Sequence, residues 1–177
     1  YTFVLRECVR PFQGALGIGD KEISGVNLVS NASALKTRTD DLRHYVSNQP
    51  NGCLLIYSDK VSEFALHIDA VTGGLVLDRL SRLYSMVCID EVQDMSGYDL
   101  ELIAALLGMV DDVRLAGDLR QTTYRTSNVR KNSKYLTMGF GQFLQDRHLD
   151  CRIDPETLRV CHRCPQAIVD LADALYP

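Results

Sequence analysis

The sequence predicts an α/β domain built around a largely parallel sheet. Short apolar runs alternate with stretches whose apolar residues recur at helical spacing, and two of those runs end directly in carboxylates. Alternating strands and helices are typical of α/β folds with a parallel sheet. Ligands of such sheets bind beyond the carboxyl ends of the strands, so the two carboxylate-ended runs are the first candidates for a functional site.

The first 52 residues predict two helices joined by a long loop. Residues 3–9 carry apolar residues at helical spacing, and Pro11 ends that helix. Residues 13–33 are rich in glycine, serine and asparagine and predict a loop. We expect a polar, partly exposed helix at residues 34–47 and a turn at residues 48–52.

A buried strand and two helices are expected next. The apolar run at residues 52–57 predicts the strand, and residues 75–84 predict the second helix. The first helix ends at Gly73–Gly74. Its apolar face follows intervals of three and four and consists of Val61, Phe64, Ala65 and Ile68.

The strand–helix pattern continues in the second half of the chain. Strands are predicted at residues 86–89 and 113–117, each followed by a carboxylate. Between them Ser96 and Asp99 fit a capping box, and Gly108 ends the helix. The apolar stripe of this helix consists of Leu100, Ile103, Ala104 and Leu107.

The last part of the chain predicts one more strand and one more helix. The strand is expected at residues 158–160, and Pro165 opens the helix. The apolar stripe of that helix consists of Ile168, Leu171, Ala172 and Leu175.

Bulk composition indicates a globular protein of the reducing cytosol. Of the 177 residues, 46% are hydrophobic and 24% are charged, which is ordinary for a soluble domain. No run approaches the roughly 18 apolar residues of a membrane span, and no signal peptide is recognisable. We therefore expect a cytoplasmic protein with reduced cysteines and no membrane partner. The chain begins at Tyr1 rather than at a methionine, so we expect a piece of a longer protein.

Charge is segregated along the chain, although the net charge is only −4. Residues 119–145 contain no acidic residue, whereas acidic residues concentrate in the stretch before them. The basic stretch predicts contact with DNA phosphates, with tyrosines available to stack on bases; a solvated loop is the alternative. The candidate DNA-binding residues are Arg120, Tyr124, Arg125, Arg130, Lys131 and Lys134.

Asp90 and Glu91 close the strand expected at residues 86–89. Adjacent strand residues point to opposite sides, so the two carboxylates can take different roles. One can hold a hydrated Mg²⁺ ion while the other meets a water molecule beside it, a division that suits phosphoryl transfer. Taken alone, an acidic pair is more simply explained as a solvated loop.

Three sequence motifs extend this hypothesis. D-E-V-Q-D at residues 90–94, G-D-L-R-Q-T-T-Y at residues 117–124 and L-R-V-C-H-R-C at residues 158–164 occur in that order. They resemble motifs II, III and IV of superfamily 1 helicases of the UvrD, Rep and PcrA group. The resemblance implies a partial RecA-like P-loop NTPase domain with a parallel sheet, which hydrolyses ATP with Mg²⁺ and moves on single-stranded or duplex DNA. It further implies that residues 86–177 form the core of the motor. Residues 1–85 would then contain the end of an early motor half and a helical inserted subdomain of the 1B kind.

The resemblance assigns catalytic roles to four residues. Asp90 would hold the metal ion and Glu91 would activate the attacking water. Gln121 would sense the γ-phosphate and couple it to DNA, and Arg163 would contact the same phosphate, for which a guanidinium is well suited. An arginine that caps the turn before the last helix is the alternative for Arg163. The implied nucleotide-binding residues are Gln93, Asp94, Asp118 and His162.

The chain also departs from the group. Thr126 stands where the relatives stack an aromatic residue on DNA, and His162 replaces a tyrosine that stacks on adenine. The form G-D-x-R-Q-x-T-Y, followed by R-K-x-x-K-Y at residues 130–135, is similar to the Gabija-type anti-phage helicase branch, which implies a nuclease subunit as a partner. No G-x-x-x-x-G-K-[ST] loop occurs, so these 177 residues alone are expected to be inactive.

Two other interpretations stay open. Cys161 and Cys164 form a C-x-x-C pair with Cys151 and His148 nearby, a set of residue types that can hold zinc. Alternatively the chain is a non-catalytic, helicase-like scaffold or partner-binding module. The presence of both strand-end carboxylates favours an active motor, because a scaffold has no chemical need for them.

Overall fold

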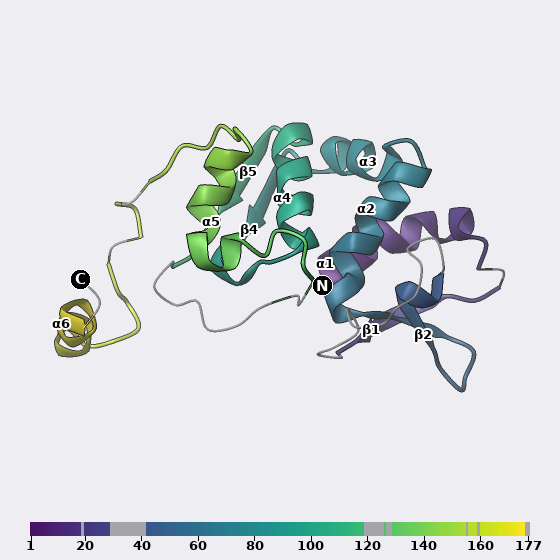
Figure 1. Cartoon of the computed structure of the whole chain (residues 1–177), viewed down its shortest axis with the longest axis horizontal. Coiled ribbons are helices and arrows are strands. Elements are labelled where there is room, and N and C mark those ends of the chain that lie inside the picture. The colour runs from purple at the N-terminus through teal and green to yellow at the C-terminus, as the bar shows by residue number, and fades with distance from the viewer. Residues whose placement is uncertain are drawn as a thin grey trace.

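The computed structural model describes residues 1–18, 20–28, 42–118, 126, 129–154, 156–158 and 160–175. Over these residues the protein is a mixed α/β structure in which helices accompany two small sheets (Figure 1). The predicted α/β class is confirmed at this level. Within the described ranges, no helix combines the length and the apolar character needed to cross a membrane.

The chain starts with a helical segment whose geometry changes along its length. Helix α1 (Thr2–Val4) runs into a π-helical turn, η1 (Leu5–Val9), and then into a 3₁₀ helix, η2 (Arg10–Leu16). Pro11 lies in the first turn of η2, where its missing N–H costs no hydrogen bond. The helix predicted at residues 3–9 is confirmed, but Pro11 changes the type of helix instead of ending it.

The first sheet has the strand order β1–β3–β2. Strand β1 (Ile23–Asn27) is parallel to β3 (Leu54–Tyr57), and β2 (Val46–Asn48) is antiparallel to β3. The strand predicted at residues 52–57 and the turn before it are confirmed.

Two expectations for this part of the chain are wrong. Strand β1 lies inside the loop predicted at residues 13–33, and β2, preceded by the short η4 (Leu42–His44), lies at the end of the helix predicted at residues 34–47. Gly25 and polar neighbours hide the strand signal of β1, and pairing with β3 supplies the stability that local propensity lacks. Residues 34–41 of the predicted helix lie outside the described residues.

The two helices after β3 form as predicted. A short 3₁₀ turn, η5 (Ser58–Lys60), leads into α2 (Val61–Val71), which is followed by α3 (Leu75–Leu83). Gly73 and Gly74 separate the helices with φ angles of 69° and 90°, which glycine adopts without strain. The predicted face of α2 is buried, with Val61, Phe64, Ala65 and Ile68 each at most 1% exposed.

The second sheet consists of two parallel strands. Strand β4 (Met86–Ile89) pairs with β5 (Asp112–Leu115), so that Ile89 lies opposite Leu115. The crossover between them contains a short 3₁₀ turn, η6 (Val92–Asp94), and helix α4 (Tyr98–Met109). Both strands and the helix are predicted from the sequence.

The predicted capping box at the start of α4 does not form. Gly97 occupies the cap position, with φ 61° and ψ −121°, and no side chain caps the helix. The carbonyl oxygen of Ser96 accepts the Asp99 N–H at 3.1 Å, but the Ser96 side chain hydrogen-bonds to Thr126 instead. The helix runs to Met109, one residue beyond Gly108, and its buried residues are Leu100, Leu102, Ile103 and Leu106.

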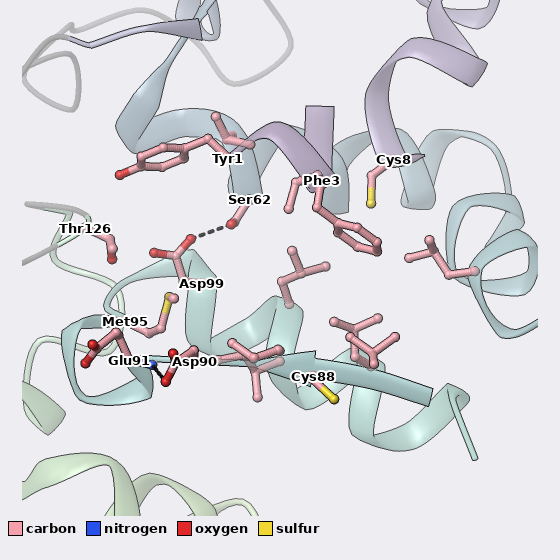
Figure 2. A pocket seen from close by; sticks show the side chains of 18 of the residues that line it. Tyr1, Phe3, Cys8, Ser62, Cys88, Asp90, Glu91, Met95, Asp99 and Thr126 are labelled. Carbon is pink, nitrogen blue, oxygen red and sulfur yellow. Dashed lines mark hydrogen bonds between the residues drawn. The ribbon is translucent and has the colours of Figure 1, made fainter. Parts of the chain in front are cut away.

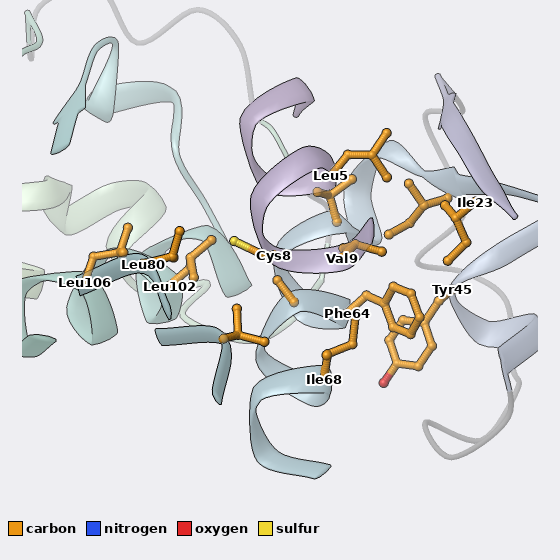
Figure 3. Packing of buried hydrophobic residues seen from close by; sticks show 14 of the residues in the cluster. Leu5, Cys8, Val9, Ile23, Tyr45, Phe64, Ile68, Leu80, Leu102 and Leu106 are labelled. Atoms are coloured by element: carbon orange, nitrogen blue, oxygen red, sulfur yellow. The ribbon is translucent and has the colours of Figure 1, made fainter. Parts of the chain in front are cut away.

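One apolar cluster runs through most of the molecule (Figure 3). It joins the N-terminal helical segment, the first sheet and α2 to α4, and it includes residues on both sides of the boundary expected after residue 85. Tyr45 stacks on Phe64 with ring centroids 4.5 Å apart near its centre. The division into residues 1–85 and 86–177 stays a prediction.

A buried ionic cluster lies beside this core. Lys60 Nζ lies 2.8 Å from Glu63 Oε2 and 2.9 Å from His44 Nε2, and all three side chains are buried. The ammonium and carboxylate groups satisfy each other, which buried charges require. The cluster fixes the start of α2 against the segment that leads into β2.

The C-terminal part contains two helices of different character. Helix α5 (Tyr135–Asp146), which the sequence analysis did not anticipate, contains a break at Gly139 with φ 83°. Helix α6 (Gln166–Leu175) forms after Pro165 as predicted, but the strand expected at residues 158–160 does not form at the described positions. Figure 1 shows α6 apart from the rest of the molecule. Its apolar stripe is exposed, at 55% for Ile168, 61% for Leu171 and 66% for Leu175.

Candidate functional site

The candidate site lies where β4 and β5 end together. The Ala116 N–H donates to the Ile89 carbonyl at 2.8 Å, and the Val92 N–H donates to the Ala116 carbonyl at 3.1 Å. The backbone contact between the two segments therefore continues past both strands. Asp90 and Glu91 lie between these two hydrogen bonds, so their position is fixed relative to the end of β5.

Glu91 has an unusual backbone conformation. Its φ and ψ are 55° and 42°, in the left-handed region that is uncommon for residues other than glycine. The Glu91 N–H donates to Asp90 Oδ1 at 2.8 Å, which stabilises the sharp turn after β4. Both carboxylates are exposed. Strained turns of this kind are found preferentially at functional sites.

Gln93 connects the two strand ends. Its Nε2 donates to Glu91 Oε2 at 2.6 Å, and its Oε1 accepts the backbone N–H of Asp118 at 3.2 Å. One amide therefore holds the Glu91 carboxylate and the loop after β5 at the same time. The structure brings together four of the predicted site residues here: Asp90, Glu91, Gln93 and Asp118.

Gly117 makes this bridge possible. A Cβ atom at this position would lie 2.4 Å from Gln93 Oε1 and 2.9 Å from Val92 Cγ2, closer than real Cβ atoms approach. In the sequence this glycine is recognisable only as the first letter of a motif. The motif's glycine is thus explained by close approach of the backbone to the Gln93 amide.

A pocket of about 660 Å³ opens beside the strand end (Figure 2). Its walls come from the N-terminal helical segment, β4 and α4, and are mostly apolar. Figure 2 shows the Asp90, Glu91, Asp99, Ser62 and Thr126 side chains toward one end of it. Asp94 and the phenol groups of Tyr1 and Tyr84 also line the pocket. Among the described residues that line it, none is a lysine, arginine or histidine.

Asp94 and Asp99 are the half-buried part of this acidic end. Asp94 Oδ1 is inaccessible and has no hydrogen-bond partner among the described residues. Burial raises the pKa of the Asp99 carboxyl, and hydrogen bonds from Ser62 and Thr126 oppose that rise. The sequence predicts only a helix-capping role for Asp99. Its place in the pocket depends on the contact between α2 and α4, which no local pattern shows.

Thr126 has a positioning role in this arrangement. Its Oγ1 accepts the Ser96 N–H at 3.0 Å and donates to the Asp94 carbonyl at 3.2 Å, while its own N–H donates to the same carbonyl at 3.2 Å. The residue that departs from the aromatic pattern of the helicase group is therefore hydrogen-bonded to the turn that carries Asp94.

The Asp90 carboxylate fits one kind of metal site. Oδ1 already accepts the Glu91 N–H, and the carboxylate is exposed, so its other oxygen can reach a hydrated ion. Mg²⁺ is commonly bound by one or two carboxylates and completes its shell with water and substrate phosphates. The described residues contain no group of three or more His, Cys, Asp or Glu that could hold a metal, so His148, Cys151 and the C-x-x-C pair do not assemble a zinc site.

The basic stretch is only partly described, and its described lysines are engaged in ion pairs. Lys131 Nζ lies 3.6 Å from Glu101 Oε1, and Lys134 Nζ lies 2.6 Å from Asp146 Oδ2. Hydrogen bonds from Lys134, Gln142 and Tyr135 lower the pKa of the Asp146 carboxyl to about 2. Arg130 is exposed, and the remaining candidates Arg120, Gln121, Tyr124 and Arg125 lie outside the described residues.

Arg163 and His162 are not brought to the site. Both are exposed and precede α6, which Figure 1 shows away from β4 and β5. Among the described residues, no hydrogen bond or ion pair joins either one to Asp90 or Glu91. Their nucleotide contacts stay predictions.

Comparison with known proteins gives no relatives. No protein-family model matches the chain. No curated protein and no solved structure matches it either. The geometry of the strand ends and the three motifs therefore carry the functional argument.

Proposed function

We propose that this chain is part of an ATP-driven motor of the superfamily 1 helicase kind, which hydrolyses ATP with Mg²⁺ to move on DNA. The observation that carries the proposal is the Gln93 amide, which joins the Glu91 carboxylate to the backbone of Asp118. These residues belong to two separate sequence motifs, and they meet at the carboxyl ends of adjacent parallel strands, where α/β folds bind ligands.

The geometry suits a division of labour between the two carboxylates. Asp90, with one oxygen occupied by the turn, would hold the Mg²⁺ ion, which would neutralise phosphate charge when bound. Glu91, kept in one orientation by Gln93, would accept a proton from the attacking water. Gln93 and Asp118 would act as positioning residues that transmit changes at the phosphate to the loop after β5.

DNA contact is proposed for the basic stretch that follows this loop. Lys131 and Lys134 form ion pairs with α4 and α5, so a structural role accounts for them. The first candidates for phosphate contact are therefore Arg120, Arg125 and Arg130. Tyr124 is available for base stacking. Such a motor, in the Gabija-like form, would have a nuclease subunit as a partner.

A non-catalytic scaffold is the second candidate, and the exposed apolar stripe of α6 favours it. Apolar helix faces that are left uncovered are typical of interaction surfaces. Under this alternative, the protein encoded by the full reading frame binds a partner and does not hydrolyse ATP.

The proposal is tested with the polypeptide encoded by the full reading frame around this segment. ATP hydrolysis is measured with and without Mg²⁺ and single-stranded DNA. A motor shows Mg²⁺-dependent hydrolysis that DNA stimulates and that Asp90→Asn abolishes, whereas the 177 residues alone show none. The matched control is Asp112→Asn at the opposite end of β5, which leaves activity unchanged. DNA or partner binding without any turnover supports the scaffold instead.

A further inference from the structure

Cys161 and Cys164 form a pair of free thiols directly before α6. The Cys164 N–H donates to Cys161 Sγ at 3.4 Å, so the intervening residues already fold the chain back on the first sulfur. Cys161 is exposed and Cys164 is half-buried. Neither thiol contributes to the apolar core, and both are accessible to a small reactant.

Cys161 differs electrostatically from the Cys8 and Cys151 thiols. Hydrogen bonds from the backbone N–H groups of Cys164 and Arg163, together with the charge of Arg163, lower its pKa. Burial has the opposite effect elsewhere: it raises the pKa of Cys8 to about 12 and also raises the pKa of Cys151. The thiolate is the nucleophilic form, so reactivity favours Cys161.

We propose that Cys161 and Cys164 are a redox-active dithiol that exchanges with low-molecular-weight disulfides. The proposal is independent of the motor function. It uses the C-x-x-C spacing, the close approach of the Cys164 backbone to the Cys161 sulfur and the exposure of Cys161 beside the half-buried Cys164. The described residues offer no third ligand that would commit the pair to a metal.

The reaction proceeds in two balanced steps. The Cys161 thiolate attacks one sulfur of the small disulfide, forms a mixed disulfide and releases one small thiolate. Cys164 then loses its proton to that released thiolate or to water and attacks Cys161 Sγ, which releases the second small thiol. The two cysteines are oxidised by two electrons, and the small disulfide is reduced to two thiols. The ring that results encloses His162 and Arg163.

The test uses the full 177-residue chain and oxidised glutathione as the probe. After incubation near neutral pH, remaining thiols are alkylated and peptides are mapped by mass spectrometry. The expected result is loss of two of the six thiols and a peptide that links Cys161 to Cys164. Cys164→Ser should stop at a glutathione adduct on Cys161, and Cys161→Ser should leave Cys164 largely unmodified.

Cys88 provides the matched control, because it is also exposed but has no second cysteine in sequence proximity. Cys88→Ser should leave the rate and the product unchanged. Faster modification of Cys88 than of Cys161, or the absence of the Cys161–Cys164 link, would overturn the proposal. Zinc bound by the isolated protein and lost in Cys161→Ser would also overturn it. Unchanged circular dichroism separates loss of reactivity from misfolding.

Discussion

Gln93 Nε2 donates to Glu91 Oε2 at 2.6 Å, and this contact orients the exposed carboxylate at the end of β4. The same amide accepts the Asp118 N–H through its oxygen. A single side chain therefore connects two segments that are separated by a helix and a strand. The first prediction follows from this bridge.

Gln93→Ala should free the backbone N–H of Asp118. The substitution removes the acceptor at 3.2 Å without touching the strand pairing. Amide hydrogen exchange at Asp118 should become faster, because a lost hydrogen bond exposes that N–H to water. The Ala116 N–H, which donates to the Ile89 carbonyl, should keep its protection. Unchanged exchange at Asp118 would show that the bridge does not persist in solution.

Gly117→Ala should destabilise the protein by about 1–3 kcal/mol, the usual range for overpacking. The new methyl group would meet Gln93 Oε1 and Val92 and push the loop after β5 away from β4. Chemical denaturation measures the free energy of unfolding. Gly108→Ala in α4 is the control, because nothing lies within 4 Å of its Cβ position. That control should stabilise the helix by roughly 0.5–1 kcal/mol, and equal destabilisation by both changes would contradict the packing argument.

Phe64→Ala should lower the free energy of unfolding by about 3–5 kcal/mol. Phe64 is 1% exposed and stacks on Tyr45 at the centre of the apolar cluster. Val71→Ala on the same helix removes a side chain that is 57% exposed and should change stability by less than about 0.5 kcal/mol. Similar losses for both variants would place the core elsewhere.

Asp99 should make stability fall as pH rises. Burial raises the pKa of the Asp99 carboxyl in the folded state above the ordinary value of 3.8. The folded protein therefore binds that proton more tightly than the unfolded chain does. This contribution is fully present below the ordinary pKa and is lost as pH rises through the raised folded pKa. Asp99→Asn keeps an acceptor for Ser62 and should lack this loss of stability as pH rises above the ordinary carboxyl pKa of 3.8. Parallel pH profiles for both proteins would contradict the assignment.

Helices and strands that depend on local sequence patterns are predicted from the sequence. Those that depend on tertiary contacts are missed. Helix α2 and strands β4 and β5 follow from apolar periodicity, and the position of Asp90 and Glu91 follows from the abrupt end of an apolar run. Strand β1 is missed, because its stability comes from pairing with β3 and not from its composition.

The candidate site shows the same division. The motifs identify Gln93 and Asp118 as members of a site. They do not show that the Gln93 amide hydrogen-bonds to the Asp118 backbone. The burial of Asp99 depends on Ser62, which lies 37 residues earlier in the chain, so no local pattern indicates it. Such details depend on contacts between segments that are far apart in the sequence. Those contacts cannot be inferred from a single sequence.

The most direct test of the motor proposal is Glu91→Gln in the polypeptide encoded by the full reading frame. Loss of a general base should reduce ATP turnover by roughly 10²–10⁴-fold. Binding of ATP with Mg²⁺ should stay within a few-fold of the parent, because Asp90 is unchanged. Glu22→Gln, an exposed glutamate in front of β1, is the control and should be fully active. Turnover that survives Glu91→Gln would contradict the account: the acid turn after β4, held by Gln93 against the loop after β5, would then not be where a water molecule is activated.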